Sequence, residues 1–176
     1  MAVSLEKVRF LVVDDNLHML TIVKTILRGF GAVYVFESKS ADDAFDRLRR
    51  DSIDIVVLDY LMGEDDGVAF LRRLRRDANS PTPFVPVIML TAHSEKARVE
   101  AARDAGVTEF CSKPVTAAEM FRKIANVVDH PRLFVRAASY FGPDRRRRPD
   151  PDYQGKERRT APNVEHAMDD AAVTAR

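Results

Sequence analysis

The alternation of short apolar runs with amphipathic stretches is the feature of this sequence that most constrains its fold. Five apolar runs have the length of strands, and the stretches between them repeat apolar residues at helical spacing. Repeated strand–helix units of this kind build a parallel sheet with helices packed on it. We expect strands at Val8–Val13, Val33–Phe36, Ile53–Leu58, Val85–Leu90 and Glu109–Cys111.

The helical stretches carry start signals that support this division of the chain. Ser40 with Asp43, and Thr116 with Glu119, each have the spacing of a capping box, in which a hydroxyl caps the first turn. The expected helices are Leu17–Arg28, Ser40–Arg50, Gly67–Arg76, Ser94–Ala105 and Thr116–Val128. The fold class is therefore expected to be α/β, a doubly wound five-stranded parallel sheet with five surrounding helices.

Composition divides the 176 residues into two unequal parts. Residues 1–130 contain all five strand–helix units and enough apolar side chains for one core. Residues 131–176 contain four further prolines after Pro131 and four consecutive arginines at 145–148. We expect this second part to be an extended or disordered arginine-rich tail.

Overall charge and cysteine content exclude several classes of protein. The 28 basic and 27 acidic residues nearly cancel, so overall charge predicts neither a nucleic-acid nor a membrane partner. Cys111 is the single cysteine, which excludes an internal disulfide and a cysteine-rich metal site. Met1–Lys7 is too short and polar for a signal peptide, and the apolar runs are too short to span a membrane. A soluble cytoplasmic protein is expected.

Five polar residues follow, or end, the predicted strands. Asp14 and Asp15 come directly after the first strand, Asp59 after the third, Thr91 after the fourth and Lys113 after the fifth. The carboxyl ends of parallel strands lie at one edge of a sheet, where such folds bind their ligands. We expect these five side chains to share one site.

The residue types at this edge suit a magnesium ion and a phosphoryl group. Three close carboxylates repel one another unless a cation lies among them, and Mg²⁺ prefers carboxylate oxygens and water as ligands. Lys113 can pair with a carboxylate or a phosphoryl oxygen, and Thr91 supplies a hydroxyl donor. Together they can stabilise the charge on a phosphoryl group while it is transferred to an aspartate.

These motifs, taken in order, resemble the receiver domain of bacterial two-component response regulators. The resemblance is carried by Asp14-Asp15, Asp59, Thr91-Ala92 and Lys113-Pro114, and it extends over about Val8–Val128. It implies a flavodoxin-like sheet with strand order 2-1-3-4-5, as in stand-alone receivers of the chemotaxis type. It also implies a sensor histidine kinase or a histidine phosphotransfer protein as the phosphoryl donor.

The resemblance assigns the phosphoryl and metal chemistry to particular residues. Asp59 would accept the phosphoryl group. Asp15 would bind Mg²⁺ directly, Asp14 would bind it partly through water, and Asp59 and the backbone carbonyl of Leu61 would be further ligands. Lys113 would pair with the phosphoryl group, and the peptide bond before Pro114 would be cis.

The resemblance also assigns a signalling step to two residues. Thr91 would move to hydrogen-bond the phosphoryl group, and Phe110 would then swing inward. Phenylalanine has no hydroxyl, so Phe110 would report the change through packing alone. The change would be sensed on the face formed by the fourth helix, the fifth strand and the fifth helix.

Two departures from the family pattern lie outside the site residues. Gly63 follows Met62 where the family often has proline, so the acidic loop Gly63–Gly67 is expected to be more flexible than usual. The connection Asp77–Val85 is longer than usual. The first departure bears on loop order and dephosphorylation rate, not on the chemistry.

The tail contains an imperfect repeat. Tyr140–Arg146 and Tyr153–Arg159 share the pattern Y-x-G-x-[D/E]-R-R. Aromatic and arginine side chains are frequent in interface hot spots. Two interpretations stay open, a solvated tail and a short element that docks on a partner or on this chain's own receiver. Its candidate interaction residues are Tyr140, Phe141, Arg145, Arg146, Tyr153, Arg158 and Arg159.

Four functions remain to be compared. The favoured one is a phosphorelay receiver that catalyses only its own phosphorylation and dephosphorylation and acts on a downstream protein, with a homodimer left open. A phosphohydrolase is disfavoured, because such enzymes commonly have an aspartate where Leu61 lies. A transcription factor is disfavoured because no pair of amphipathic helices follows Arg132, although the arginines could bind a phosphate backbone non-specifically. A phosphorylation-independent adaptor would not need the complete acceptor set.

Overall fold

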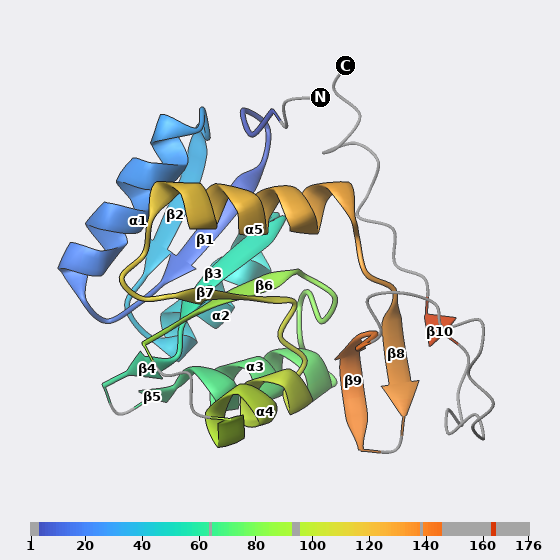
Figure 1. Cartoon of the computed structure of the whole chain (residues 1–176). Helices are drawn as coiled ribbons and strands as arrows, with labels where there is room; N and C mark the ends of the chain where they lie inside the picture. The colour runs from blue at the N-terminus through green and yellow to red at the C-terminus, as the bar shows by residue number, and fades with distance from the viewer. Residues whose placement is uncertain (1–3, 64, 93–95, 138, 146–162, 165–176) are drawn as a thin grey trace.

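Five parallel strands form the central sheet of the computed structural model, which describes residues 4–63, 65–92, 96–137, 139–145 and 163–164 (Figure 1). Hydrogen bonding orders them β2-β1-β3-β6-β7, which in chain order is the predicted 2-1-3-4-5. The strands are β1 (Arg9–Val13), β2 (Tyr34–Ser38), β3 (Ile55–Asp59), β6 (Val87–Thr91) and β7 (Glu109–Ser112). The predicted doubly wound fold is confirmed.

Five helices cover the sheet on both faces. They are α1 (Leu17–Gly29), α2 (Ala41–Arg50), α3 (Gly67–Arg76), α4 (Lys96–Asp104) and α5 (Ala117–Asp129). Figure 1 shows α1 and α5 on one face and α2, α3 and α4 on the other. Within the described residues, none of these helices is long and apolar enough to cross a membrane.

Alternation along the strands divides the core into two layers. In β1, Leu11 and Val13 pack with the α2–α4 layer, whereas Phe10 and Val12 pack with the α1–α5 layer. All five residues of β3 are buried, as expected for a central parallel strand. Both layers therefore hold β3 in a fixed position, and Asp59 ends this strand.

Hydrogen-bonded caps fix the residues at which α2 and α5 begin. The Ser40 hydroxyl accepts a hydrogen bond from the Asp43 amide, and the Thr116 hydroxyl accepts one from the Glu119 amide. Both predicted caps are confirmed. The Glu119 carboxylate, however, accepts a hydrogen bond from the Ser112 hydroxyl at 2.8 Å, so it joins the start of α5 to the end of β7.

Two small elements were not predicted from the sequence. The acidic loop after β3 contains a short antiparallel pair, β4 (Leu61–Met62) with β5 (Asp65–Asp66).

The predicted fourth helix was expected to begin at Ser94. Residues 93–95, including Ser94, lie outside the described part of the chain, and α4 begins at Lys96.

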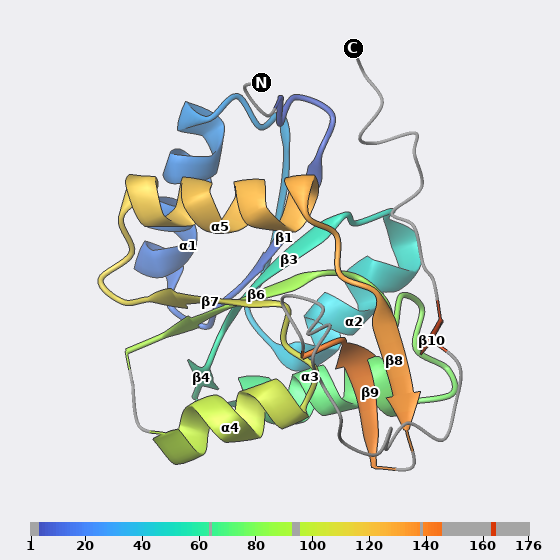
Figure 2. The ribbon, with the colours of Figure 1, turned by 45° about the vertical axis from the view of Figure 1, so that its right-hand side comes forward.

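The C-terminal part differs most from expectation. After α5 the chain forms an antiparallel hairpin of β8 (Phe134–Ala137) and β9 (Tyr140–Pro143), and β10 (Asn163–Val164) pairs with β8. An extended or disordered segment was predicted here, because prolines and arginines dominate its composition. Figure 2 shows this hairpin beside α3. Phe134 and Phe141 are buried, and they provide the apolar area that makes the hairpin pack on the domain.

Candidate functional site

Three carboxylates meet at the carboxyl end of the sheet. Asp14 and Asp15 follow β1, Asp59 ends β3, and these two strands are neighbours. One oxygen from each aspartate lies within 4.8 Å of the others. Asp14 is 1% exposed and Asp59 is 6% exposed, whereas Asp15 is exposed to solvent. The structure therefore brings together the three acidic residues that the sequence placed at one edge.

Local hydrogen bonds hold Asp14 in place. Its backbone amide donates to the Ser38 carbonyl at 3.1 Å, and its Oδ1 accepts from the Asn16 amide at 2.9 Å. Its other oxygen, Oδ2, is buried and receives no hydrogen bond from the described residues. A buried carboxylate oxygen without a donor is costly, and a cation beside it would relieve that cost.

Lys113 lies among these carboxylates. Its Nζ is 2.8 Å from Asp59 Oδ1 and 3.6 Å from Asp14 Oδ2. Its backbone amide donates to the Thr91 carbonyl at 2.9 Å, which fixes the end of β7 against the end of β6. The peptide bond from Lys113 to Pro114 is cis, as expected.

The electrostatics of this cluster leave room for a divalent cation. Three carboxylates and one ammonium group give a formal excess of two negative charges (3 − 1 = 2). Burial, together with the negative charges of Asp59 and Asp15, raises the pKa of Asp14 despite the Asn16 hydrogen bond and the charge of Lys113. The oxygen donors, their spacing and the Asp14 oxygen that receives no hydrogen bond from the described residues fit a hard ion such as Mg²⁺.

Two glycines bring backbone close to the acidic cluster. A Cβ at Gly63 would lie 3.0 Å from Asp15 Oδ2, so the loop between β4 and β5 borders the site. A Cβ at Gly67 would lie 2.2 Å from the Asp59 carbonyl oxygen, so only glycine lets the start of α3 pack there. Gly67 was not predicted from the sequence as a positioning residue. Its place at the first position of a predicted helix was the available signal.

Thr91 and Phe110 lie on the strands next to Asp59. Asp59 pairs with Leu90, so Thr91 is one residue further along the neighbouring strand. Phe110 pairs with Met89 and is half-buried against the α2–α4 layer of the core. The Leu61 side chain is exposed, and its backbone pairs with Asp66 at the edge of the site. The roles of Thr91, Phe110 and the Leu61 carbonyl stay predictions.

The tail candidates do not join this site. Tyr140, Phe141 and Arg145 pack near Phe84 and Gly106, which precede β6 and β7 and so lie at the amino end of the sheet. Arg146, Tyr153, Arg158 and Arg159 lie outside the described residues, as does the second copy of the repeat. The first copy therefore docks on the chain's own domain, one of the two interpretations that the sequence left open.

Comparison with known proteins gives one consistent family. Residues 10–125 match the model of the response regulator receiver domain. Chemotaxis protein CheY-3 of Vibrio cholerae is 30% identical over 128 residues, which cover 73% of this chain and 97% of that protein. Transcriptional regulatory protein ZraR of Salmonella typhimurium is 30% identical over 126 residues, which cover 72% of this chain but 27% of that protein.

Solved structures share the fold. Vibrio cholerae chemotaxis protein CheY4 superposes with a TM-score of 0.63 at 22% identity, over 68% of this chain and 98% of that one. A CheY-like receiver domain protein from Methanospirillum hungatei superposes with a TM-score of 0.61 at 22% identity, over 69% of this chain and 94% of that one. Both superpositions therefore support the same arrangement of sheet and helices in this chain and in those proteins.

Proposed function

Since the chain belongs to the response regulator receiver domain family, which acts in two-component phosphorelay signalling, we propose that Asp59 is its phosphoryl acceptor. The observation that carries this proposal is the contact of Lys113 Nζ with Asp59 at 2.8 Å inside a cluster of three carboxylates. Asp59 is nearly buried, yet it ends its strand at the ligand-binding edge of the sheet. It is therefore held in place by its strand at the edge where ligands bind.

The transfer is a displacement at phosphorus. A carboxylate oxygen of Asp59 attacks the phosphorus of a phosphohistidine on a sensor kinase or a histidine phosphotransfer protein. The new bond joins that oxygen to phosphorus, the bond from phosphorus to the histidine nitrogen breaks, and its electron pair stays with the histidine. Lys113 contacts the same carboxylate, so its charge offsets the negative charge on the phosphoryl oxygens.

Asp14, Asp15, Asp59 and the backbone carbonyl of Leu61 would hold Mg²⁺ in this proposal. When bound, the ion supplies positive charge to the oxygens of the group being transferred. Asp14 is suited to this task because its Oδ1 is held by the Asn16 amide while its Oδ2 receives no hydrogen bond from the described residues. Asp15 is suited because it is exposed and beside the Gly63 loop.

The remaining steps concern output and reversal. Water attacks the phosphorus of the acyl phosphate, the bond to the Asp59 oxygen breaks, and inorganic phosphate leaves. The chain thus catalyses its own modification and its reversal, and we propose no other enzymatic activity. The Thr91 hydroxyl bonds the phosphoryl group, and Phe110 transmits the change to a downstream protein partner. We place this exchange in the cytoplasm on the strength of family membership.

A direct test uses acetyl phosphate as a small-molecule donor. Wild-type protein with Mg²⁺ should gain the mass of one phosphoryl group, and Asp59→Asn or addition of EDTA should abolish the gain. Asp46→Asn, which removes an exposed carboxylate on α2, is the matched control and should be labelled normally. Equal labelling of Asp59→Asn, or labelling undiminished in EDTA, would refute the proposal. Sustained turnover of a phosphate ester would instead identify a phosphohydrolase.

A further inference from the structure

The C-terminal hairpin, defined as β8 and β9 with flanking residues from Arg132 to Arg145, covers the amino ends of β6 and β7 (Figures 1 and 2). Its two buried phenylalanines, Phe134 and Phe141, pack edge-on against Phe84 at centroid distances of 5.4 and 5.3 Å. Phe84 belongs to the connection between α3 and β6, which the sequence predicted to be longer than usual. This connection therefore provides an aromatic contact for the hairpin.

A buried arginine joins the hairpin to the receiver. Arg75 is 2% exposed, its Nε donates to the Gly106 carbonyl at 3.1 Å, and one terminal nitrogen donates to the Pro83 carbonyl at 2.7 Å. Its guanidinium lies over the Phe134 ring, 5.0 Å from the centroid. One side chain on α3 thus contacts the turn before β7, the connection before β6 and the hairpin.

The hairpin also contacts the elements that carry the proposed signal. A Cβ at Gly142 would lie 2.7 Å from the Cα of Gly106, so the two backbones touch between the end of α4 and the start of β7. Arg145 forms an ion pair with Asp104, the last residue of α4, at 2.9 Å. Arg132 donates to the Thr108 carbonyl at 3.1 Å, two residues before Phe110.

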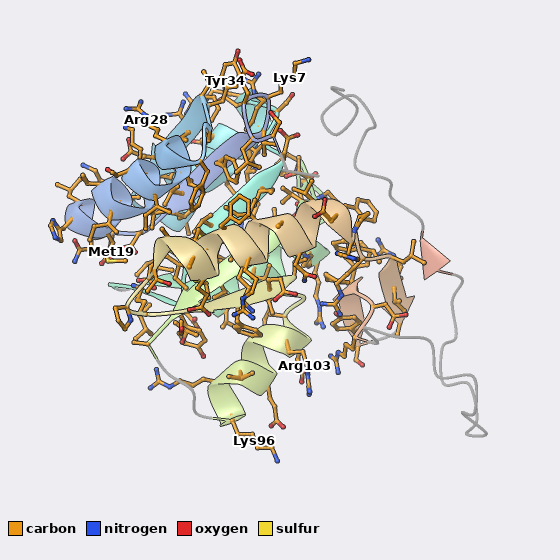
Figure 3. The ribbon with its side chains drawn as sticks, turned by 45° about the horizontal axis from the view of Figure 1, so that its top comes forward. Lys7, Met19, Arg28, Tyr34, Lys96 and Arg103 are labelled. Carbon is orange, nitrogen blue, oxygen red and sulfur yellow. The ribbon has the colours of Figure 1, made fainter. Side chains whose placement is uncertain are left out.

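A pocket of about 240 Å³ separates α4 from the hairpin. Its walls include Val99 and Arg103 on α4, Phe110 on β7, and Tyr140 and Pro143 on the hairpin. Arg103 lies at the end of α4 that faces the hairpin, opposite Lys96 (Figure 3). Phe110, the residue proposed to move on phosphorylation, and the hairpin therefore form two walls of the same pocket.

We propose that docking of the C-terminal hairpin and phosphorylation of Asp59 are coupled and oppose each other. The proposal rests on the phosphoryl chemistry proposed above. Inward movement of Phe110 takes its ring out of the pocket and removes an apolar wall opposite Tyr140. The phosphorylated state then holds the hairpin less firmly, and the docked hairpin favours the unphosphorylated state. Residues Tyr140, Phe141 and Arg145 become available to a partner only after phosphorylation.

Coupling of this kind is reciprocal, which allows it to be measured from both sides. If a phosphoryl mimic weakens hairpin docking by some factor, complete undocking must strengthen binding of the mimic by the same factor. Typical couplings between two sites correspond to roughly 5- to 150-fold. Both measurements use the full chain.

The first measurement follows amide hydrogen exchange with and without beryllofluoride and Mg²⁺. Exchange of the β8 and β9 amides should accelerate by about tenfold, within the usual range of such couplings. Amides of β1, which β3 and β6 separate from β7 in the sheet, provide the internal control and should not accelerate. Unchanged or slower exchange in β8 and β9 would overturn the coupling.

The second measurement compares beryllofluoride affinity among variants. Arg145→Ala removes the ion pair with Asp104, and because that pair is partly exposed the affinity should rise by about two- to fivefold. Gly142→Ala places a Cβ against Gly106 and should raise the affinity by about tenfold. Arg136→Ala is the matched control, because the Arg136 guanidinium lies over the Phe141 ring inside the hairpin, 4.2 Å from its centroid.

The outcomes separate this inference from the proposed function. If Arg145→Ala and Gly142→Ala leave the affinity unchanged or lower it while wild-type protein binds beryllofluoride, the coupling is wrong and the acceptor site stands. If wild-type protein binds no beryllofluoride at Asp59, the proposed function is itself wrong.

Discussion

The two ends of the sheet handle buried charge in opposite ways. At the carboxyl end, Asp14 and Asp59 are almost fully buried, and with Asp15 they outnumber the single ammonium group of Lys113. At the amino end, the guanidinium of Arg75 is as deeply buried, but it contacts two backbone carbonyls and an aromatic ring. The carboxyl end therefore keeps an excess of negative charge, whereas at the amino end neutral groups of the fold surround a single positive charge.

This difference suits the carboxyl end to reversible binding of ligands and the amino end to a permanent structural role. An excess of negative charge can be satisfied by a cation that binds and dissociates, so we expect the carboxyl end to respond to Mg²⁺ and to a phosphoryl group. Carbonyls and rings belong to the fold and cannot be exchanged. Burial lowers the pKa of Arg75 to about 9, which still leaves it charged at neutral pH. Substitutions at the two ends should therefore respond differently to Mg²⁺.

The largest effect is expected for Arg75→Met. Methionine fills similar volume but leaves the buried Gly106 carbonyl and the half-buried Pro83 carbonyl without this donor, and a group left without its partner costs about 1–3 kcal/mol when fully buried. We expect the free energy of unfolding to fall by about 2–4 kcal/mol in urea titrations, equally in EDTA and in Mg²⁺. Arg72→Met, on the same helix but exposed, should change it by less than about 0.5 kcal/mol. A loss that Mg²⁺ reverses would contradict the separation of the two ends.

An intermediate loss of stability is expected for alanine substitutions at two glycines that have similar backbone conformations but different surroundings. Gly31 and Gly106 have φ values of 90° and 96°, but a Cβ at Gly31 would meet nothing, whereas one at Gly106 would lie 2.8 Å from the Phe141 carbonyl oxygen. Gly31→Ala should cost about 1 kcal/mol through backbone strain alone. Gly106→Ala should cost about 1–3 kcal/mol more, because the hairpin must shift. Equal losses in thermal or urea unfolding would show that the hairpin does not press on this turn.

The sequence predicted the strand–helix units and the acidic site because both depend on local pattern. Ile53–Leu58 is almost entirely apolar, which predicts a buried strand. Asp59 follows it directly and therefore lies at the edge of the sheet, whatever the packing of other side chains. The same reasoning placed Asp14 and Lys113. A parallel sheet turns positions along the chain into neighbours at one edge, so the site needed no knowledge of side-chain packing.

The amino end could not be predicted in the same way because it depends on distant partners. The hairpin strands have four residues each, and β9 ends in Pro143, which is unusual for a strand. Their stability comes from Phe84, Gly106 and other residues far away in the sequence. For Arg75 a signal existed, since it lies four residues after buried Leu71 and so on the apolar face of its helix.

The smallest effect, and the one with the opposite sign, is expected for Asp14→Asn. Burial and neighbouring carboxylates raise the pKa of Asp14, so the folded chain holds this proton at pH values where the unfolded chain has already lost it. Stability therefore falls as pH rises above 3.8, the ordinary value for aspartate, and the penalty persists at neutral pH. Asparagine keeps an oxygen for the Asn16 amide and carries no charge. In EDTA at pH 7 it should stabilise the fold by about 1 kcal/mol, the usual size of a single-residue effect.

Magnesium should reverse this gain, and that reversal is what distinguishes the carboxyl end from the amino end. The ion stabilises wild-type protein by binding the folded state, and a site with one carboxylate fewer binds it more weakly. In millimolar Mg²⁺ the wild type should therefore equal or exceed Asp14→Asn in free energy of unfolding. Asp46→Asn, an exposed carboxylate on α2, controls for net charge and should not respond to Mg²⁺. If Asp14→Asn were less stable than wild type even in EDTA, the uncompensated charge at this end would have to be balanced by groups of the protein itself, as it is around Arg75.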